Sequence, residues 1–165
     1  MKAIILAAGE GKRMKSEIPK VLHKICGKTM ISYVIDACEK AEIKDIVIVI
    51  GHQADMIKNS VQKENISGVN VDFVYQKEQL GTGHAVMCAK EFINGEDILI
   101  LNGDTPLVTH ETLKKLSDIH NKSNAVTLIS TIVENPNGYG RIVRRENKFS
   151  KIVEDKDADQ NEALI

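Results

Sequence analysis

Continuous apolar runs alternate with helical stripes along the first part of the chain. Residues 3–6 and 46–50 form runs rich in β-branched side chains, which are typical of parallel strands buried on both faces. Between these runs, apolar residues recur every three or four positions over residues 30–41, a spacing that predicts an amphipathic helix. The chain therefore begins with a predicted strand, helix and second strand.

The same alternation continues beyond residue 50. It predicts two more helices and two more strands, at residues 54–63, 83–92, 69–75 and 97–101. Thr109 is a suitable N-cap for a further helix, with Leu113 and Leu116 on its inner face. Strands that alternate with helices predict an α/β fold, here a Rossmann-like, doubly wound and mainly parallel sheet with right-handed crossovers.

The pattern changes in the last part of the chain. Residues 125–133 predict another strand, and residues 139–144 and 149–153 predict an antiparallel hairpin that turns at Glu146 and Asn147. Residues 155–165 are polar at first and then apolar, and they stop without a cap or turn. We expect residues 1–165 to be one domain that is incomplete at its C-terminal end.

Composition limits the range of partners. The 165 residues are 42% hydrophobic and 27% charged, with a net charge of -1, so no overall field would attract nucleic acid or an anionic membrane. No apolar span approaches the ~20 residues that cross a bilayer, and no secretory signal is visible. The cysteines, Cys26, Cys38 and Cys88, lie in apolar patterns, so we expect them to be reduced core residues in a cytoplasmic protein.

A glycine-rich basic loop follows the first strand. Gly9 and Gly11 allow backbone N–H groups to approach an oxyanion, and Lys12 and Arg13 add positive charge, so the loop is a candidate phosphate cradle. A surface loop without a ligand is the alternative. Pro19-Lys20 weakens that alternative, because a lysine held behind a rigid proline can reach the same phosphates.

Two other glycine-loop types fit poorly. A dinucleotide-binding loop needs a third glycine where Met14 stands and an acidic residue where the second strand ends in Gly51-His52. A P-loop would use Gly27-Lys28-Thr29 as its tail, but it needs a glycine where Leu22 stands. Both alternatives fail at a residue that their chemistry requires.

Two further segments follow predicted strands. Residues 76–85 carry amide, hydroxyl and backbone groups that suit the edge of a nucleobase, at the sheet edge where α/β folds bind ligands. For His84 we favour packing at a helix start over catalysis. Asp104 directly follows a buried strand beside Gly103, which suits a Mg²⁺ ligand, although an aspartate there is also a common turn or cap residue.

The predicted hairpin carries a fourth candidate site. Gly138 and Gly140 suit a bulge or the close approach of a ligand, and Glu154 at the strand end can accept hydrogen bonds from sugar hydroxyls. A simple hairpin with a charged exit is the alternative.

Two motifs carry a family resemblance. Leu6-Ala7-Ala8-Gly9-x-Gly11-x-Arg13-Met14 and the following Pro19-Lys20-Val21-Leu22 resemble the signature of nucleotidyltransferases that make nucleoside diphosphate sugars. The resemblance implies the nucleotide-diphospho-sugar transferase type of fold. It also implies that Leu6, Ala7, Ala8 and Gly9 wrap the nucleoside triphosphate, that Arg13 engages the departing pyrophosphate, and that Lys20 contacts the phosphate being joined.

The run from Gln79 to Ala85 resembles bacterial N-acetylglucosamine-1-phosphate uridylyltransferases in particular. The resemblance implies that one group of positions recognises uracil and that another holds the N-acetylglucosamine unit. These positions are Gln76, Gly81 and Thr82 for uracil, and Gly140 and Glu154 for the sugar. It further implies substrate contacts at Asn102, Gly103 and Asp104, with Asp104 as the Mg²⁺ ligand and, with Arg13 and Lys20, a catalytic residue.

The implied reaction joins UTP and N-acetylglucosamine 1-phosphate into UDP-N-acetylglucosamine and pyrophosphate, for peptidoglycan and lipopolysaccharide precursors. It needs no general base, because a phosphate nucleophile is already ionised. In this family two asparagines and an acetyltransferase β-helix that forms the trimer follow downstream, so we expect this chain alone to turn over poorly. The alternatives are a nucleotidyltransferase for another sugar 1-phosphate and a non-catalytic sugar-nucleotide-binding domain.

Overall fold

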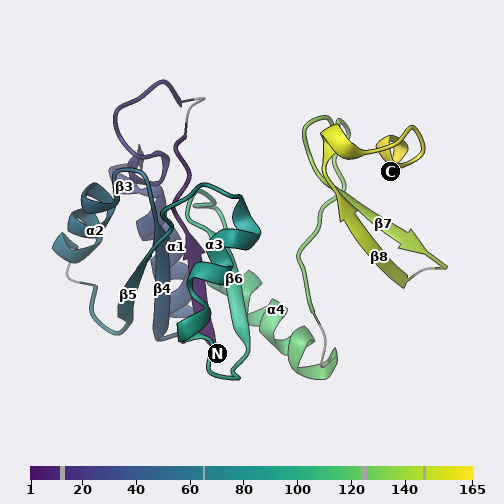
Figure 1. Cartoon of the computed structure of the whole chain (residues 1–165). Helices are drawn as coiled ribbons and strands as arrows, with labels where there is room; N and C mark the ends of the chain where they lie inside the picture. The colour runs from purple at the N-terminus through teal and green to yellow at the C-terminus, as the bar shows by residue number, and fades with distance from the viewer. Residues whose placement is uncertain (12–13, 65, 124–125, 147) are drawn as a thin grey trace. The chain divides into compact units, whose positions relative to one another are not determined.

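The structure is a computed structural model that describes residues 1–11, 14–64, 66–123, 126–146 and 148–165. The chain divides into two compact units, Met1–Lys122 and Ser123–Ile165, and each is described by itself (Figure 1). Among the described residues, no helix is both long enough and apolar enough to cross a membrane.

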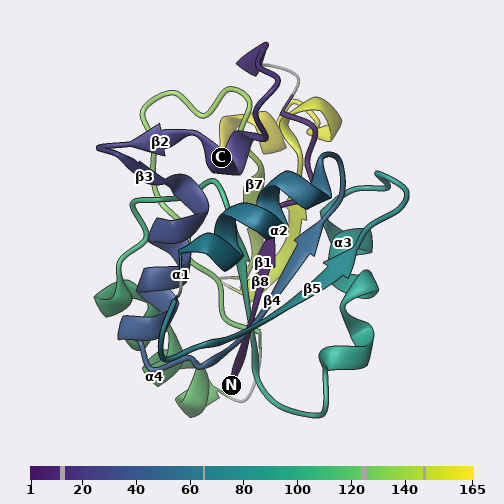
Figure 2. The same cartoon turned by 90° about the vertical axis from the view of Figure 1, so that its left-hand side faces the viewer.

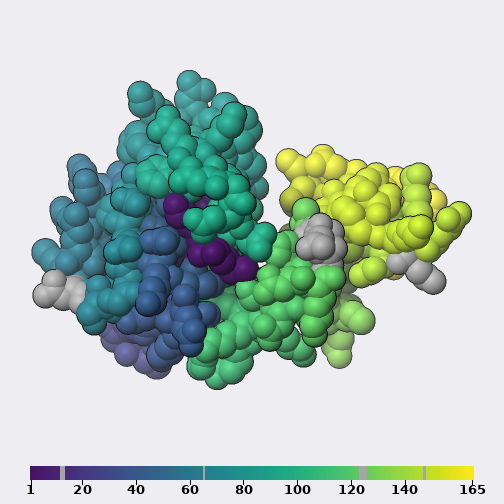
Figure 3. Space-filling view, turned by 90° about the horizontal axis from the view of Figure 1, so that it is seen from below, coloured from purple at the N-terminus to yellow at the C-terminus, as the bar shows by residue number. Residues whose placement is uncertain are grey.

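The first unit contains a four-stranded parallel sheet with the strand order β5-β4-β1-β6. Its strands are β1 Lys2–Leu6, β4 Asp45–Ile50, β5 Asn70–Tyr75 and β6 Ile98–Asn102. The central strands are fully buried at Ile4, Ile5 and Ile48. Only small areas of the N-terminal segment reach the surface that Figure 3 shows. The four strands that the hydrophobic pattern predicted in this unit are confirmed.

Helices cover both faces of this sheet, as the doubly wound prediction requires. The helices are α1 Met30–Lys40, α2 Ala54–Lys63, α3 Thr82–Cys88 and α4 His110–Ser123. Residues of α1, α2 and α4 pack with Ala3 and Ile5 of β1, whereas Ala85 of α3 packs with Ile4 on the opposite face. Figure 2 shows α1 and α2 lying across one side of the strands. Successive β1 residues therefore anchor opposite layers, as the alternation of side chains along a strand requires.

The helix boundaries agree closely with the sequence, with one difference. Thr109 caps α4, since its Oγ1 accepts a hydrogen bond from the Thr112 backbone N–H at 3.4 Å. The predicted helix over residues 83–92 is instead α3 followed by a separate 3-10 helix, Lys90–Phe92. The apolar spacing continues through both segments, so periodicity alone did not reveal the break.

A small hairpin between β1 and α1 corrects one prediction about the cysteines. It consists of β2 Lys24–Ile25 and β3 Lys28–Thr29, joined by Cys26 and Gly27 at φ values of 50° and 85°. Two successive residues with positive φ form the two-residue turn whose backbone twist matches that of the flanking strands. Cys26 is therefore an exposed turn residue and not a core residue, whereas Cys38 is buried and Cys88 is half-buried, and all three are free thiols.

The second unit is built on an antiparallel hairpin, as predicted. Its strands are β7 Arg141–Arg145 and β8 Lys148–Val153, with an irregularity between Val143 and Arg144. The predicted strand at residues 125–133 is wrong for the described residues 126–133, which form no strand. Ile132 there is fully exposed. A strand needs a neighbour for its backbone hydrogen bonds, and no described strand pairs with this segment.

A glycine directly after β4 lets two loops pass close together. A Cβ atom on Gly51 would lie 2.9 Å from the Ala8 carbonyl oxygen and 3.0 Å from the Ala8 Cβ. Both distances are shorter than a carbon normally tolerates, and the Ala8 backbone is held in place by the sheet below it. The loop that follows β1 can therefore take this position only because residue 51 has no side chain.

We expect Gly51→Ala to lower the free energy of unfolding by about 1–3 kcal/mol, because the backbone at Ala8 must move to admit the methyl group. The matched control is Gly83→Ala, where no atom lies within 4 Å of the added Cβ. Gly83 lies in α3, so alanine there should be neutral or stabilise by up to ~1 kcal/mol. Urea unfolding followed by circular dichroism measures both changes. Equal effects of the two substitutions would contradict the close-approach argument.

The cysteines give a second test of the fold. Burial raises the pKa of the Cys38 thiol to about 12, so it stays protonated and unreactive at any pH well below that value. Cys26 is exposed. We expect a thiol reagent at neutral pH to modify Cys26 rapidly in the folded protein and Cys38 only after denaturant is added, as followed by mass spectrometry of the peptides. Cys26→Ser should remove the rapid phase, and rapid modification of Cys38 would show that the core is not packed as described.

Candidate functional site

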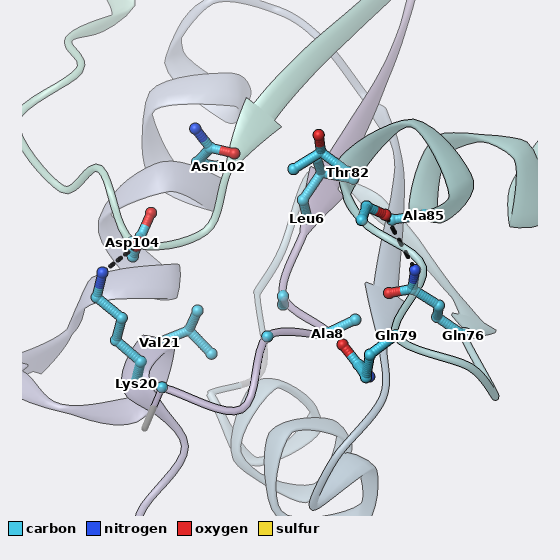
Figure 4. Close-up of a pocket in the computed structure, with 14 residues that line it drawn as sticks. Leu6, Ala8, Lys20, Val21, Gln76, Gln79, Thr82, Ala85, Asn102 and Asp104 are labelled. Carbon is cyan, nitrogen blue, oxygen red and sulfur yellow. Dashed lines mark hydrogen bonds and ion pairs between the residues drawn. The ribbon is translucent and has the colours of Figure 1, made fainter. Parts of the chain in front are cut away.

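A cavity of about 350 Å³ lies in the first unit at the carboxyl ends of the parallel strands (Figure 4). The chain moves from β1 to β4 and β5 on one side of β1, and then crosses to β6 on the other side. Loops that leave neighbouring strands in opposite directions open a crevice at such a reversal. Leu6 and Asn102 end β1 and β6 side by side, and both line the cavity.

The cavity gathers most of the residues that the sequence singled out. Those that line it are Leu6, Ala7, Ala8, Gly9, Lys20, Gln76, Gly81, Thr82, Asn102 and Asp104. Four lining residues were quoted in the motifs without a predicted contact: Gly11, Val21, Gln79 and Ala85. Arg13, predicted to engage pyrophosphate, lies outside the described residues. The lining residues lie close together because the carboxyl ends of parallel strands share one edge of the sheet.

Gly103 lies beneath the cavity rather than in its lining. Its backbone N–H donates to the Leu6 carbonyl oxygen at 2.9 Å. A Cβ atom on Gly103 would lie 3.1 Å from that same oxygen and 3.1 Å from Val21 Cγ1. The missing side chain lets the end of β6 pack directly on β1, and this contact places Asp104 at the cavity.

The loop after β1 presents small residues to the cavity. Ala7 and Ala8 are 4% exposed, and Gly11 adopts φ +62°, a left-handed conformation that favours glycine. A Cβ on Gly11 would lie 3.1 Å from Lys20 Cβ. The loop therefore folds back closely enough to bring Lys20 beside the backbone that follows β1.

Lys20 and Asp104 meet at one side of the cavity. Lys20 Nζ donates to Asp104 Oδ2 at 2.5 Å, and the two side chains are 38% and 29% exposed. Lys20 begins a 3-10 helix directly after Pro19, and Asp104 follows β6 in a turn that Thr105 closes on the Asn102 carbonyl oxygen at 2.7 Å. A half-exposed pair of this kind can exchange partners when an anion or a cation arrives.

The donor set at Asp104 suits one kind of metal ion. No cluster of three or more His, Cys, Asp or Glu side chains that could hold a metal occurs among the described residues. Mg²⁺ is commonly held by one or two carboxylates, with substrate phosphates and water completing its octahedron. A single carboxylate beside a cavity of about 350 Å³ therefore fits a Mg²⁺ ion that substrate phosphates and water would also coordinate, and it does not fit a metal site formed by the protein alone.

A buried amide lies at the other side of the cavity. Gln76 is 3% exposed, and its Nε2 donates to the Gly81 carbonyl oxygen at 3.2 Å. The same nitrogen lies 3.1 Å from His84 Nδ1. Gly81 has φ +95° and leads directly into α3. His84 is half-buried at the helix start, as the packing interpretation expected, and it also has a polar role that the sequence analysis missed.

Gly140 and Glu154, the predicted sugar contacts, belong to the second unit. Glu154 is exposed and follows β8 directly. The Gly138 N–H donates to Asp155 Oδ2 at 2.9 Å, and the buried Arg141 donates from Nη2 to Asp155 Oδ1 at 3.0 Å. Asp155 thus holds the loop that carries Gly140 to the strand end at Glu154. One signal in the sequence indicated the pair formed by Arg141 and Asp155, which is that each of them directly follows a predicted sugar contact.

Comparison with known proteins identifies close relatives. The chain is 51% identical over 166 residues to the bifunctional protein GlmU of Clostridium perfringens (strain SM101 / Type A), covering 99% of this chain and 36% of that protein. It is 52% identical over 168 residues to the bifunctional protein GlmU of Clostridioides difficile (strain 630), covering 99% of this chain and 35% of that one. The chain therefore spans about a third of the length of these curated relatives.

A solved structure supports the fold. The crystal structure of HddC from Yersinia pseudotuberculosis complexed with GMP-PN matches with a TM-score of 0.74 at 28% identity, covering 93% of this chain and 68% of that one. The family model for nucleotidyl transferases matches residues 2–159. Because that match extends over nearly the whole sequence, the chain belongs to the nucleotidyl transferase family.

Proposed function

We propose that this chain is the nucleotide-activating part of a uridylyltransferase that joins UTP and N-acetylglucosamine 1-phosphate. The products are UDP-N-acetylglucosamine and pyrophosphate. The observation that carries the proposal is a single cavity with a Lys–Asp ion pair at one side and amide side chains at the other. In Figure 4, Lys20 and Asp104 lie at one side and Gln76 and Gln79 at the other.

The phosphate side suits nucleotidyl transfer without covalent help from the protein. The phosphate of the sugar is already ionised, so the protein has to align it and neutralise charge on the triphosphate. Lys20 would leave Asp104 and bind phosphate oxygens, while the loop after β1 offers backbone N–H groups to the same anion. Asp104 would hold Mg²⁺, which when bound supplies positive charge to the triphosphate.

The remaining roles come from the family resemblance. Arg13 would engage the departing pyrophosphate, and Gln76, Gly81 and Thr82 would contact uracil. Gly140 and Glu154 would hold the amino sugar. Asn102 and Gly103 would position the substrate beside Asp104.

The relatives are named as bifunctional proteins, and this chain matches about a third of their length. We therefore assign only the uridylyl transfer to these residues. By the family resemblance, acetyl transfer and trimer formation would be carried by a downstream β-helix, and we assign neither to these residues. The proposed protein acts in the cytoplasm, where UTP is available, and its product serves the synthesis of peptidoglycan and lipopolysaccharide precursors.

Asp104→Asn tests the phosphate side. We expect the affinity for UTP with Mg²⁺ to fall by about tenfold or more, because one charged ligand of the bridging ion is lost. Calorimetry measures the affinity with and without Mg²⁺, and pyrophosphate release with N-acetylglucosamine 1-phosphate measures turnover.

Asp36→Asn is the matched control. Asp36 pairs with Lys28 as Asp104 pairs with Lys20, but it lies outside the cavity, so UTP binding should not change. If UDP-N-acetylglucosamine binds equally well without Mg²⁺ and in Asp104→Asn, the chain is a sugar-nucleotide-binding domain and not a transferase.

A panel of acceptors tests the sugar. We expect N-acetylglucosamine 1-phosphate to support faster pyrophosphate release than glucose 1-phosphate or galactosamine 1-phosphate at equal concentration. Glu154→Gln, which keeps the shape but removes the charge, should lower kcat/KM for the preferred sugar while the KM for UTP changes little. A preference for either of the other two sugars would replace the proposed substrate and leave the nucleotidyl transfer intact.

A further inference from the structure

The Gln76 amide has only two hydrogens, and the protein accepts both. The Gly81 carbonyl oxygen can only accept, so the nearer atom of the amide must be its nitrogen, at 3.2 Å. The reverse orientation would place two oxygens against each other. The second hydrogen points to His84 Nδ1, which lies 3.1 Å from the same nitrogen.

This arrangement determines which nitrogen of His84 carries the proton. A neutral imidazole has one donor and one acceptor nitrogen, so Nδ1 accepts from Gln76 only when the proton is on Nε2. His84 Nε2 lies 3.9 Å from Cys88 Sγ, one turn further along α3. Sulfur is a weak acceptor, so this contact is compatible with a proton on Nε2 and adds little to it.

The Oε1 atom of Gln76 is then the polar atom of this amide that is left for a ligand. Gln76 lines the cavity although it is almost fully buried. In Figure 4 its nitrogen lies on the dashed line and its oxygen turns toward the Ala8 side. This oxygen is open to the cavity, so a ligand that displaces water from it loses a hydrogen bond unless it presents an N–H group there.

We propose that His84 is a positioning residue that fixes the Gln76 amide as a pure acceptor and thereby selects uracil over cytosine. Uracil carries a hydrogen on its ring N3, which can donate to Gln76 Oε1. Cytosine has a lone pair at N3, which would face the Gln76 oxygen without a hydrogen between them. The inference rests on the proposed function, because it names the determinant of base choice in that same cavity.

The experiment compares UTP with CTP by calorimetry in the presence of Mg²⁺, using the whole chain. His84→Phe keeps an aromatic ring but removes the acceptor, which leaves one amide hydrogen of Gln76 without a partner in the protein. We expect the ratio of UTP to CTP affinity to fall about tenfold. Thermal unfolding of each variant shows whether the fold is retained.

His84→Asn is the conservative variant. Its Oδ1 can take the place of Nδ1, since both atoms are bonded to Cγ, so we expect it to restore the ratio to within about threefold of the wild type. If His84→Phe does not fold, His84→Gln replaces it, because its amide oxygen is one carbon further from the backbone and should lose the same selectivity. Cys88→Ala should leave the ratio unchanged.

The outcomes separate this inference from the proposed function. If the wild-type chain prefers UTP and His84→Phe weakens both nucleotides equally, His84 only supports the helix, and this inference fails while the uridylyltransferase stands. If the wild-type chain binds neither nucleotide, the proposed function fails and the inference fails with it. Preservation of the UTP preference in every His84 variant would also overturn the inference.

Discussion

The close packing of β1 between β4 and β6 is the constraint on which the site depends. At the carboxyl end of β1, a Cβ atom on Gly51 would lie 2.9 Å from the Ala8 carbonyl oxygen, and one on Gly103 would lie 3.1 Å from that of Leu6. Two neighbouring strands therefore approach the exit of β1 through positions without a side chain. The loop after β1 stays low against the sheet, and the cavity forms above it. Larger residues at these points would fill the space or lift the loop.

The two sides of the cavity differ in how freely their side chains can change partners. Lys20 and Asp104 are half-exposed, and their ion pair is weak enough for either partner to turn to a phosphate or a cation. Gln76 is almost fully buried, and its hydrogen bonds are made to the protein, so its orientation costs energy to change. Affinity for a triphosphate needs charges that can rearrange, whereas discrimination between bases needs a group that cannot.

Much of the fold was predictable because its signals are local. The β-branched run at residues 46–50 and the apolar stripe of α1 each indicate their own structure, and parallel topology then gathers Leu6, Asn102 and the residues after them at one edge. The errors arose where structure depends on a distant partner. The apolar side chains in residues 126–133 indicated a segment that would be buried as a strand, but the pattern contains no information about a neighbouring strand for its hydrogen bonds. The contact between Gln76 and His84 is a matter of side-chain geometry that no spacing reveals.

The second unit contains an ion pair with a buried arginine, and this pair lies next to both positions proposed for sugar recognition. Few of the residues that the structure describes in this unit are buried, and they include Arg141, whose guanidinium donates to Asp155 and to the Pro136 carbonyl oxygen at 2.8 Å. A buried arginine is costly unless it is paired, so Asp155 must stay in place for the hairpin to keep its form. Asp155 directly follows Glu154, and Arg141 directly follows Gly140. The ion pair between Arg141 and Asp155 therefore joins the residues that directly follow the two positions proposed for the sugar, and a change at either partner would move the backbone at both positions.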